Sequence, residues 1–112
     1  MKLYEVKAII RPERMDDVVQ GLHEIPELPG VTVSLVRGLG RRVWTQPVGD
    51  REYGETEMVK LEIVVTNQLL PRVVGAVERA AHTGRAGDGK VFVSEIADCV
   101  NIRSGRRGAE AL

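Results

Sequence analysis

Hydrophobic and polar residues alternate along this chain with two different periods, which predict strands and helices in a definite order. Four segments show the alternation of a half-buried strand. They begin at Leu3, Val31, Val59 and Val91. Apolar residues recur at helical spacing over residues 15–25 and 70–81. The order is therefore βαββαβ, which predicts an α+β, ferredoxin-like domain with two helices on one face of an antiparallel sheet.

Proline and capping residues set the expected boundaries of these elements. Pro12 ends the first strand pattern, because proline cannot donate to a strand ladder. Asn67 is the expected N-cap of the second helix, with Pro71 in its first turn. We also expect a short extra strand over residues 100–103 and a charged C-terminal tail over about 106–112.

A stretch of some fifteen residues, from Arg41 to about Glu57, shows neither period and predicts a long, flexible loop. Loops longer than about 12–15 residues in a compact domain are usually functional or disordered. This one carries Trp44 and Tyr53 among charges of both signs, a composition that suits an adaptable contact surface. A merely tolerated insertion is the plainer explanation, and the sequence leaves both open.

The second face of the predicted sheet is partly apolar. Ile9, Val64 and Phe92 fall on the opposite parity to the main apolar positions of their strands. A two-layer domain would expose these side chains to water. Burial against other copies removes that exposure, so we expect a homo-oligomer.

Size and charge narrow the classes of function. The chain has 112 residues, which suits one domain spanning 1–112, and 16 basic residues balance 16 acidic ones. We therefore expect neither a nucleic-acid partner nor a membrane partner. No membrane-spanning run or signal peptide is expected, and the single cysteine, Cys99, suits a reducing cytoplasm.

The segment Thr83–Lys90, here called the glycine-rich loop, reads TGRAGDGK and lies between a helix pattern and a strand pattern. Glycine lets backbone N–H groups come close to an anion, and successive N–H groups form an anion nest. Lys90 adds a point charge, and Arg103 farther along offers a guanidinium fork. These groups predict phosphate binding. A purely structural loop is the alternative.

Other classes of protein fit the sequence less well. An enzyme would need a base, a nucleophile or a metal cluster, and we expect no catalytic or metal-binding residues. An RNA-binding module of the same βαββαβ order stacks bases on strand aromatics, whereas aromatic residues are only 4% of this chain. A trimeric metal-tolerance protein of similar fold would leave the glycine-rich loop unexplained.

Three motifs resemble those of the PII signal-transduction proteins. Gly38-Leu-Gly-Arg41 matches the family's signature before its long T-loop, Thr83–Lys90 matches the family's B-loop, and Arg103-Ser-Gly105 matches its C-terminal motif. The resemblance covers nearly the whole chain. It implies a cytoplasmic homotrimer that binds AMP, ADP or ATP in clefts between subunits and signals to a partner protein through the T-loop.

The resemblance also assigns roles by position. Phosphate contacts would come from the glycine-rich loop of one subunit and from Arg103 of its neighbour. The base of the T-loop, with Gly38, Gly40 and Arg41, would lie beside the phosphates. The adenine and ribose would be enclosed by Ile9, Thr32, Glu62 and Val64. The implied nucleotide-binding residues are Ile9, Thr32, Gly38, Gly40, Arg41, Glu62, Val64, Gly87, Asp88, Gly89, Lys90 and Arg103.

Three residues depart from the family pattern. Arg42 stands where the nitrogen sensors have a glutamine that ligates magnesium, and Met58 stands where they have a lysine that pairs with 2-oxoglutarate. We therefore expect no Mg-2-oxoglutarate site. Asn101 replaces an arginine beside Arg103, which predicts that AMP or ADP competes well with ATP.

These departures suggest a different second effector. Gly40, Arg41 and Arg42 could accept a small anion such as bicarbonate, as in PII-like proteins linked to inorganic-carbon uptake or carboxysomes. We therefore expect a PII-like regulator of inorganic-carbon metabolism. The alternatives are a nitrogen-regulatory PII protein and a weak nucleotide-hydrolysing enzyme. Arg42, Trp44 and Tyr53 are the expected partner-contacting residues, and modification of Tyr53 is a lesser expectation.

Overall fold

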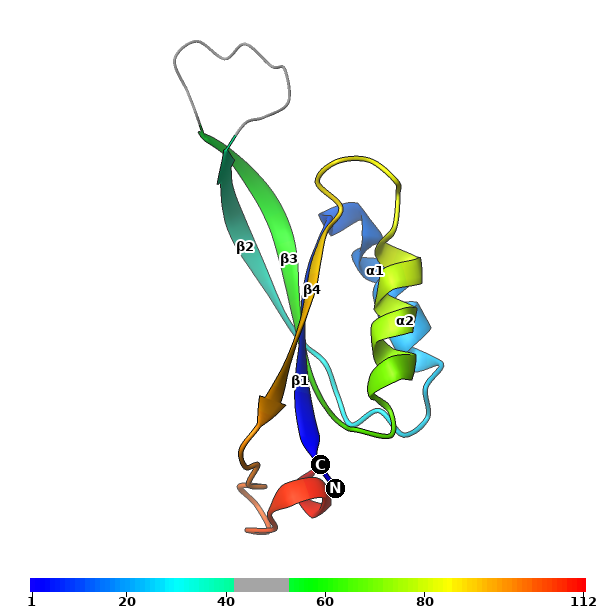
Figure 1. Ribbon diagram of the computed structural model, residues 1–112, viewed down its shortest axis with the longest axis vertical. Helices are drawn as coiled ribbons and strands as arrows, with labels where there is room; N and C mark the ends of the chain where they lie inside the picture. Colours follow the sequence, from blue (N-terminus) through cyan, green and yellow to red (C-terminus); the bar gives the residue numbers. More distant parts are fainter. Residues whose placement is uncertain (42–52) are drawn as a thin grey trace.

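The computed structural model describes residues 1–41 and 53–112. The strands are β1 (Leu3–Ile10), β2 (Thr32–Arg41), β3 (Tyr53–Thr66) and β4 (Gly89–Ile96). The α-helices are α1 (Met15–His23) and α2 (Leu70–Ala81), and 3-10 helices cover Pro12–Arg14 (η1) and Gly108–Ala111 (η2). The sheet order is β2-β3-β1-β4 with antiparallel neighbours, and both α-helices cover one face (Figure 1). The predicted ferredoxin-like fold is confirmed.

The core lies between the sheet and the two α-helices. β1 and β3 pair so that Val6 faces Ile63 and Ala8 faces Leu61, and all four side chains are fully buried. The helices complete the core with the apolar stripes that the sequence predicts. Their fully buried members are Val18 and Leu22 of α1 and Val73 and Val77 of α2. Cross-strand register therefore places one parity of β1 and β3 in the core.

The predicted start of the second helix was wrong by a few residues. Leu69 takes the N-cap position, and no side chain caps it by hydrogen bonding. Asn67 lies two positions earlier, in a turn just beyond the β1–β3 pair, where its backbone N–H donates to the carbonyl of Lys2. Pro71 does lie in the first turn, as predicted.

The expected limits of the long loop were too wide. β2 continues to Arg41 and β3 begins at Tyr53, so residues 53–57 are strand rather than loop. Pairing explains the error: Arg37 lies opposite Glu57, and an Arg37 Nη1–Glu55 ion pair of 3.0 Å crosses the two strands. The side chains of residues 55–57 are exposed and polar, so they carry no hydrophobic alternation.

The C-terminal segment also differs from its prediction. Residues 100–103 form no strand; instead a single bridge joins Val100 to Arg107 around a turn. The charged tail ends in η2, whose Ala111 is buried. The segment folds back beside the N-terminus of the chain (Figure 1).

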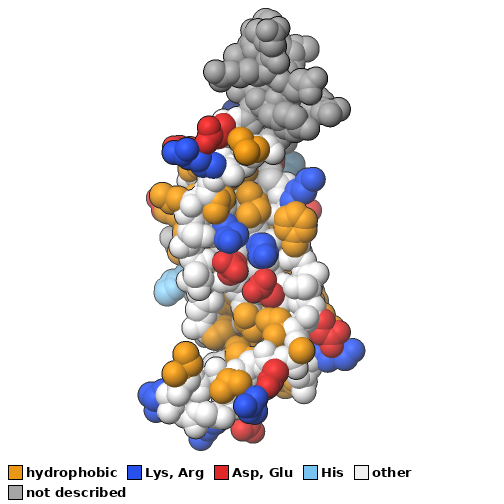
Figure 2. Space-filling model, turned by 90° about the vertical axis from the view of Figure 1, so that its left-hand side faces the viewer, with side chains coloured by type: hydrophobic (Ala, Val, Ile, Leu, Met, Phe, Trp, Pro, Cys, Tyr) orange, Lys and Arg blue, Asp and Glu red, His pale blue; other side chains and the backbone are white. Residues whose placement is uncertain are grey.

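The sheet face away from the helices is a mixture of charged and apolar side chains. Lys7 pairs with Glu5 at 3.9 Å, and Lys60 pairs with Glu62 at 3.6 Å. Figure 2 shows basic and acidic side chains together in the middle of this face, with hydrophobic side chains above and below them. Phe92 is 52% exposed here. The prediction of a partly apolar second face is confirmed.

Within the described residues, neither α-helix has the length and hydrophobicity needed to cross a bilayer.

Candidate functional site

The glycine-rich loop connects the end of α2 to the start of β4, and glycine geometry fixes its course. Gly84, Gly87 and Gly89 have φ of +86°, +94° and +102°, where L side chains are strained. Gly89 is also packed against β1, since a Cβ there would lie 1.7 Å from the carbonyl oxygen of Ile9. The loop therefore enters the sheet through a contact that only glycine permits.

The side chain of Asp88 ties the glycine-rich loop together by hydrogen bonds. Its carboxylate accepts hydrogen bonds from the Thr83 hydroxyl, from the Thr83 N–H at 2.8 Å and from the Gly84 N–H at 2.9 Å. The Thr83 hydroxyl, the Thr83 N–H and the Arg11 guanidinium, in that order, hold the pKa of Asp88 well below its usual value, with a smaller contribution from Gly84. Asp88 is expected among the phosphate contacts, but its carboxylate is turned toward donors of the loop. Its part in the site is to shape the loop.

Arg11 also belongs to the candidate site, although no local sequence pattern points to it. Its Nε donates to Asp88 Oδ1 at 2.9 Å, and its Nη2 donates to the carbonyl of Ala86 at 2.6 Å. The sequence shows only a basic residue at the end of a strand pattern, 77 positions away from Asp88. The βαββαβ topology could have suggested the contact, because it brings the end of β1 beside the start of β4.

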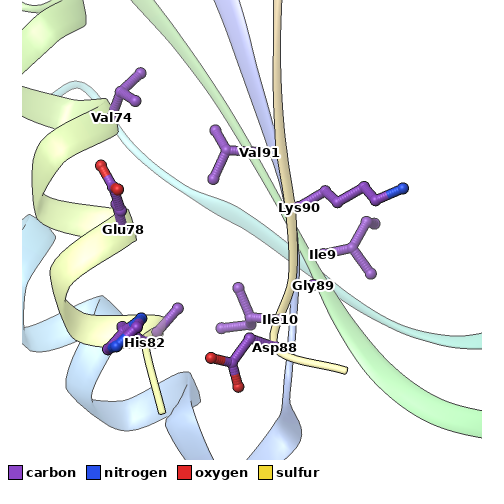
Figure 3. A pocket seen from close by; sticks show the side chains of 10 residues that line it. Ile9, Ile10, Val74, Glu78, His82, Asp88, Gly89, Lys90 and Val91 are labelled. Atoms are coloured by element: carbon purple, nitrogen blue, oxygen red, sulfur yellow. The ribbon is translucent and has the colours of Figure 1, made fainter. Parts of the chain in front are cut away.

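Lys90 and Ile9 lie next to each other on the sheet face away from the helices. They are register partners in the β1–β4 pair. Figure 3 shows both side chains pointing away from a cavity of about 300 Å³ on the helix side, which Glu78 and His82 line. The structure thus brings Lys90, Ile9 and the backbone of the glycine-rich loop close to one another.

A second group of predicted residues lies farther down the same face. Thr32 is the register partner of Glu62, and Val64 follows two positions later on β3. These three line a cavity of about 450 Å³ together with residues of the C-terminal segment, among them Cys99 and Ala111. The expected base and ribose contacts are therefore close to the segment that carries Arg103.

The two groups lie at opposite ends of β4. The glycine-rich loop precedes Gly89, whereas Arg103 follows Ile96 through a turn. The seven steps between the 8 residues of β4, at about 3.3 Å each, separate its ends by roughly 23 Å. One chain therefore does not bring its Arg103 side chain to its own Gly87–Lys90 segment (Figure 1).

The predicted residues at the base of the long loop are only partly described. Gly38 lies in β2 opposite Thr56 and beside Met58. For Gly40, Arg41 and Tyr53 the structure places only the backbone, in the β2–β3 ladder. The predicted partner and effector residues Arg42 and Trp44 lie outside the described residues.

Met58 lines another cavity, of about 520 Å³, between β3, the end of β1 and the glycine-rich loop. Its side chain is only 9% exposed, and Arg11 lines the same cavity. Two nitrogens of Arg11 already bind Asp88 and Ala86.

Among residues 1–41 and 53–112, no group of three or more His, Cys, Asp or Glu side chains could hold a metal ion.

The fold and site together define a class: a small ferredoxin-like α+β domain whose edge strand begins at a glycine-rich loop suited to anions. The chain belongs to the nitrogen regulatory protein P-II family, whose family model matches residues 3–106. It is 39% identical over 111 residues to the nitrogen regulatory protein P-II of Azospirillum brasilense, covering 96% of this chain and 98% of that protein. The corresponding protein of Rhodospirillum rubrum is 40% identical, with the same coverage.

Solved structures support the same family assignment. The B. subtilis GlnK–ATP complex matches with a TM-score of 0.84 and 36% identity, covering 99% of this chain and 98% of that one. Arabidopsis thaliana PII bound to citrate matches with a TM-score of 0.82 and 38% identity, covering 99% of this chain and 92% of that one. The resemblance stated from the sequence motifs is confirmed.

Proposed function

We propose that this protein is a P-II-type regulator that binds adenine nucleotides and passes the signal to a partner protein through the segment between β2 and β3. The observation that carries the proposal is the glycine-rich loop, which Asp88 and Arg11 hold in shape beside Lys90 and Ile9. A preformed loop of N–H groups with one lysine suits phosphate oxygens. The similarity to GlnK bound to ATP supports the same ligand class.

The proposed binding site lies between copies of the chain in a homotrimer. Gly87–Lys90 and Ile9 of one copy would face Arg103 of another, because β4 separates these groups within one chain. The partly apolar sheet face, with Phe92 exposed, favours burial against other copies. We place Thr32, Glu62 and Val64 against the base and ribose of the same nucleotide.

Nitrogen regulation is the cellular role that we propose, the alternative given in the sequence analysis. The named relatives are nitrogen regulatory proteins, and none of them supports a role in bicarbonate or carboxysome metabolism. The proposal keeps one expectation drawn from the departures from the family pattern, namely that an ordinary 2-oxoglutarate site is absent. Met58 supports this part, because a nearly buried thioether offers no cation to a carboxylate.

The protein acts in this proposal by a shift between conformations and not by catalysis. A nucleotide changes signalling only if it binds one state of the partner-contacting segment more tightly than another. Arg41, Arg42, Trp44 and Tyr53 belong to that segment or its base, and the cytoplasm is the proposed compartment.

Calorimetric titration of the whole protein with ATP, ADP and AMP tests the proposal. Each nucleotide is added alone, with magnesium and 2-oxoglutarate, or with bicarbonate. We expect saturable nucleotide binding, with ADP comparable to ATP and no enhancement by 2-oxoglutarate. Absence of nucleotide binding would refute the function. Tight magnesium-dependent 2-oxoglutarate binding would refute the effector claim, and a bicarbonate effect would restore the inorganic-carbon hypothesis.

A further inference from the structure

We infer that Asn101 is a positioning residue that holds the C-terminal turn in the shape that presents Arg103 to the nucleotide. The inference rests on the proposed function. Asn101 is then more than the loss of a cation beside Arg103.

The side chain of Asn101 makes three hydrogen bonds inside the C-terminal segment. Its Oδ1 accepts from the N–H groups of Arg103 and Ser104, both at 3.0 Å. Its Nδ2 donates to the carbonyl of Ala111 at 3.2 Å. One half-buried side chain therefore ties the turn on one side and η2 on the other.

The backbone of Asn101 is used as well. Its N–H donates to the carbonyl of Arg106 at 2.9 Å, and its carbonyl accepts from the N–H of Gly105 at 2.8 Å. Asn101 thus stands at the base of the turn that carries Arg103. An asparagine amide suits this place, because it combines an acceptor for two N–H groups with a donor.

Apolar packing does little to hold the tip of this turn. Ile102 is fully exposed. Outside the turn, the bridge between Val100 and Arg107 and the 2.5 Å ion pair of Arg107 with Asp98 close the two arms. Asn101 connects those arms to the backbone of Arg103, so losing its side chain leaves the arms closed and the tip loose.

An arginine at position 101 could not do the same work. A guanidinium has five donors and no acceptor, so it would leave the N–H groups of Arg103 and Ser104 without their partner. The two interpretations of Asn101 therefore predict opposite results for Asn101→Arg. A missing cation would be restored and ATP binding strengthened, whereas a lost anchor would weaken binding.

The test compares Asn101→Ala, Asn101→Arg, Arg103→Ala and the double variant N101A/R103A in the whole protein. Asn67→Ala, at an exposed asparagine outside the site, is the matched control. ATP and ADP affinities are measured by calorimetry, and amide hydrogen exchange is measured at residues 103 and 104. Melting curves check that each variant is folded.

We expect Asn101→Ala and Asn101→Arg to weaken ATP and ADP binding by about tenfold, the effect of two lost backbone hydrogen bonds. Exchange at residues 103 and 104 should accelerate in both variants, and Asn67→Ala should change neither quantity. The double variant should bind no more weakly than Arg103→Ala alone, because Asn101 acts through Arg103.

Stronger ATP binding by Asn101→Arg, or additive losses in the double variant, would overturn the inference while leaving nucleotide binding intact. A wild-type protein that binds neither nucleotide would instead refute the proposed function and, with it, the presentation of Arg103. The two failures are distinguished by the wild-type titration.

Discussion

The substitution Gly89→Ala tests how firmly the glycine-rich loop is fixed to the sheet. A Cβ at this position would lie 1.7 Å from the Ile9 carbonyl oxygen and 2.8 Å from its carbon, whereas real Cβ contacts essentially never fall below 3.0 Å. Relief of the contact with the oxygen requires β1 and β4 to separate by at least about 1.3 Å, the difference between 1.7 and 3.0 Å. A ladder hydrogen bond of about 2.9 Å does not survive that displacement.

The energetic cost follows from two causes. The φ of +102° at Gly89 costs an L residue about 1–3 kcal/mol. Losing one or two ladder hydrogen bonds near Ile9 adds about 1 kcal/mol each. We therefore expect Gly89→Ala to lower the free energy of unfolding by about 2–5 kcal/mol. We also expect it to weaken nucleotide binding, because Lys90 moves with the strand.

Two other glycines provide graded controls. Gly108 has a φ of +65° but nothing within 4 Å of an added Cβ, so Gly108→Ala isolates the backbone strain, about 1 kcal/mol. Gly30 has neither a positive φ nor a neighbour within 4 Å, so Gly30→Ala should change stability by less than about 0.5 kcal/mol. Urea unfolding followed by circular dichroism, at one protein concentration, measures all three. The reasoning is refuted if Gly89→Ala costs no more than Gly108→Ala.

Two further predictions concern the residues that hold the loop and α2 in place. Because the pKa of Asp88 is lowered in the folded protein, its contribution to stability is complete above the unfolded value near pH 4 and is lost as the pH falls below it. Urea unfolding between about pH 6 and pH 2 should therefore show a steeper acid loss for wild type than for Asp88→Asn; equal slopes would contradict the assignment. Arg14 donates through Nε and Nη2 to the Ala80 carbonyl at 2.8 and 2.6 Å, so Arg14→Gln should cost about 1–2 kcal/mol in the same assay. Arg72→Gln, which breaks an exposed 3.8 Å contact with Glu27, should cost less than about 0.5 kcal/mol, and equal costs would argue against the Arg14 contact.

The hydrophobic periods predicted all four strands and both α-helices. In β1, β3 and the helices the apolar side is buried in the core, whereas apolar side chains of β2 and β4 stay exposed, with Leu35 at 81% and Val93 at 46%. The hydrophobic periods missed strand residues whose side chains are polar and exposed. Residues 53–57 are strand because they pair with β2, for example Glu57 with Arg37. The side chains of residues 55–57 are exposed and polar, so they carry no hydrophobic alternation. The short strand expected over 100–103 is absent, because hydrogen bonds from the N–H groups of Arg103 and Ser104 to Asn101 turn the chain there.

The glycine-rich loop could be predicted from its composition, because glycine is the residue that adopts the positive φ found at Gly84, Gly87 and Gly89. The contacts that shape it could not. Arg11 reaches Asp88 across 77 positions, and no local pattern reports a contact of that range. The separation of Arg103 from Lys90 likewise depends on the length and direction of β4, which only the assembled sheet reveals.

The central claim is that two copies of the chain complete each nucleotide site. Lys90→Ala and Arg103→Ala damage opposite halves, and the Asn67→Ala protein serves as the undamaged control. The decisive measurement is ATP binding by a refolded one-to-one mixture of the Lys90→Ala and Arg103→Ala proteins. The account predicts that each variant alone binds weakly, while the mixture regains wild-type affinity in about a quarter of its clefts, those that combine the two intact halves. Weak binding in every cleft of a mixture shown to contain mixed trimers would contradict it.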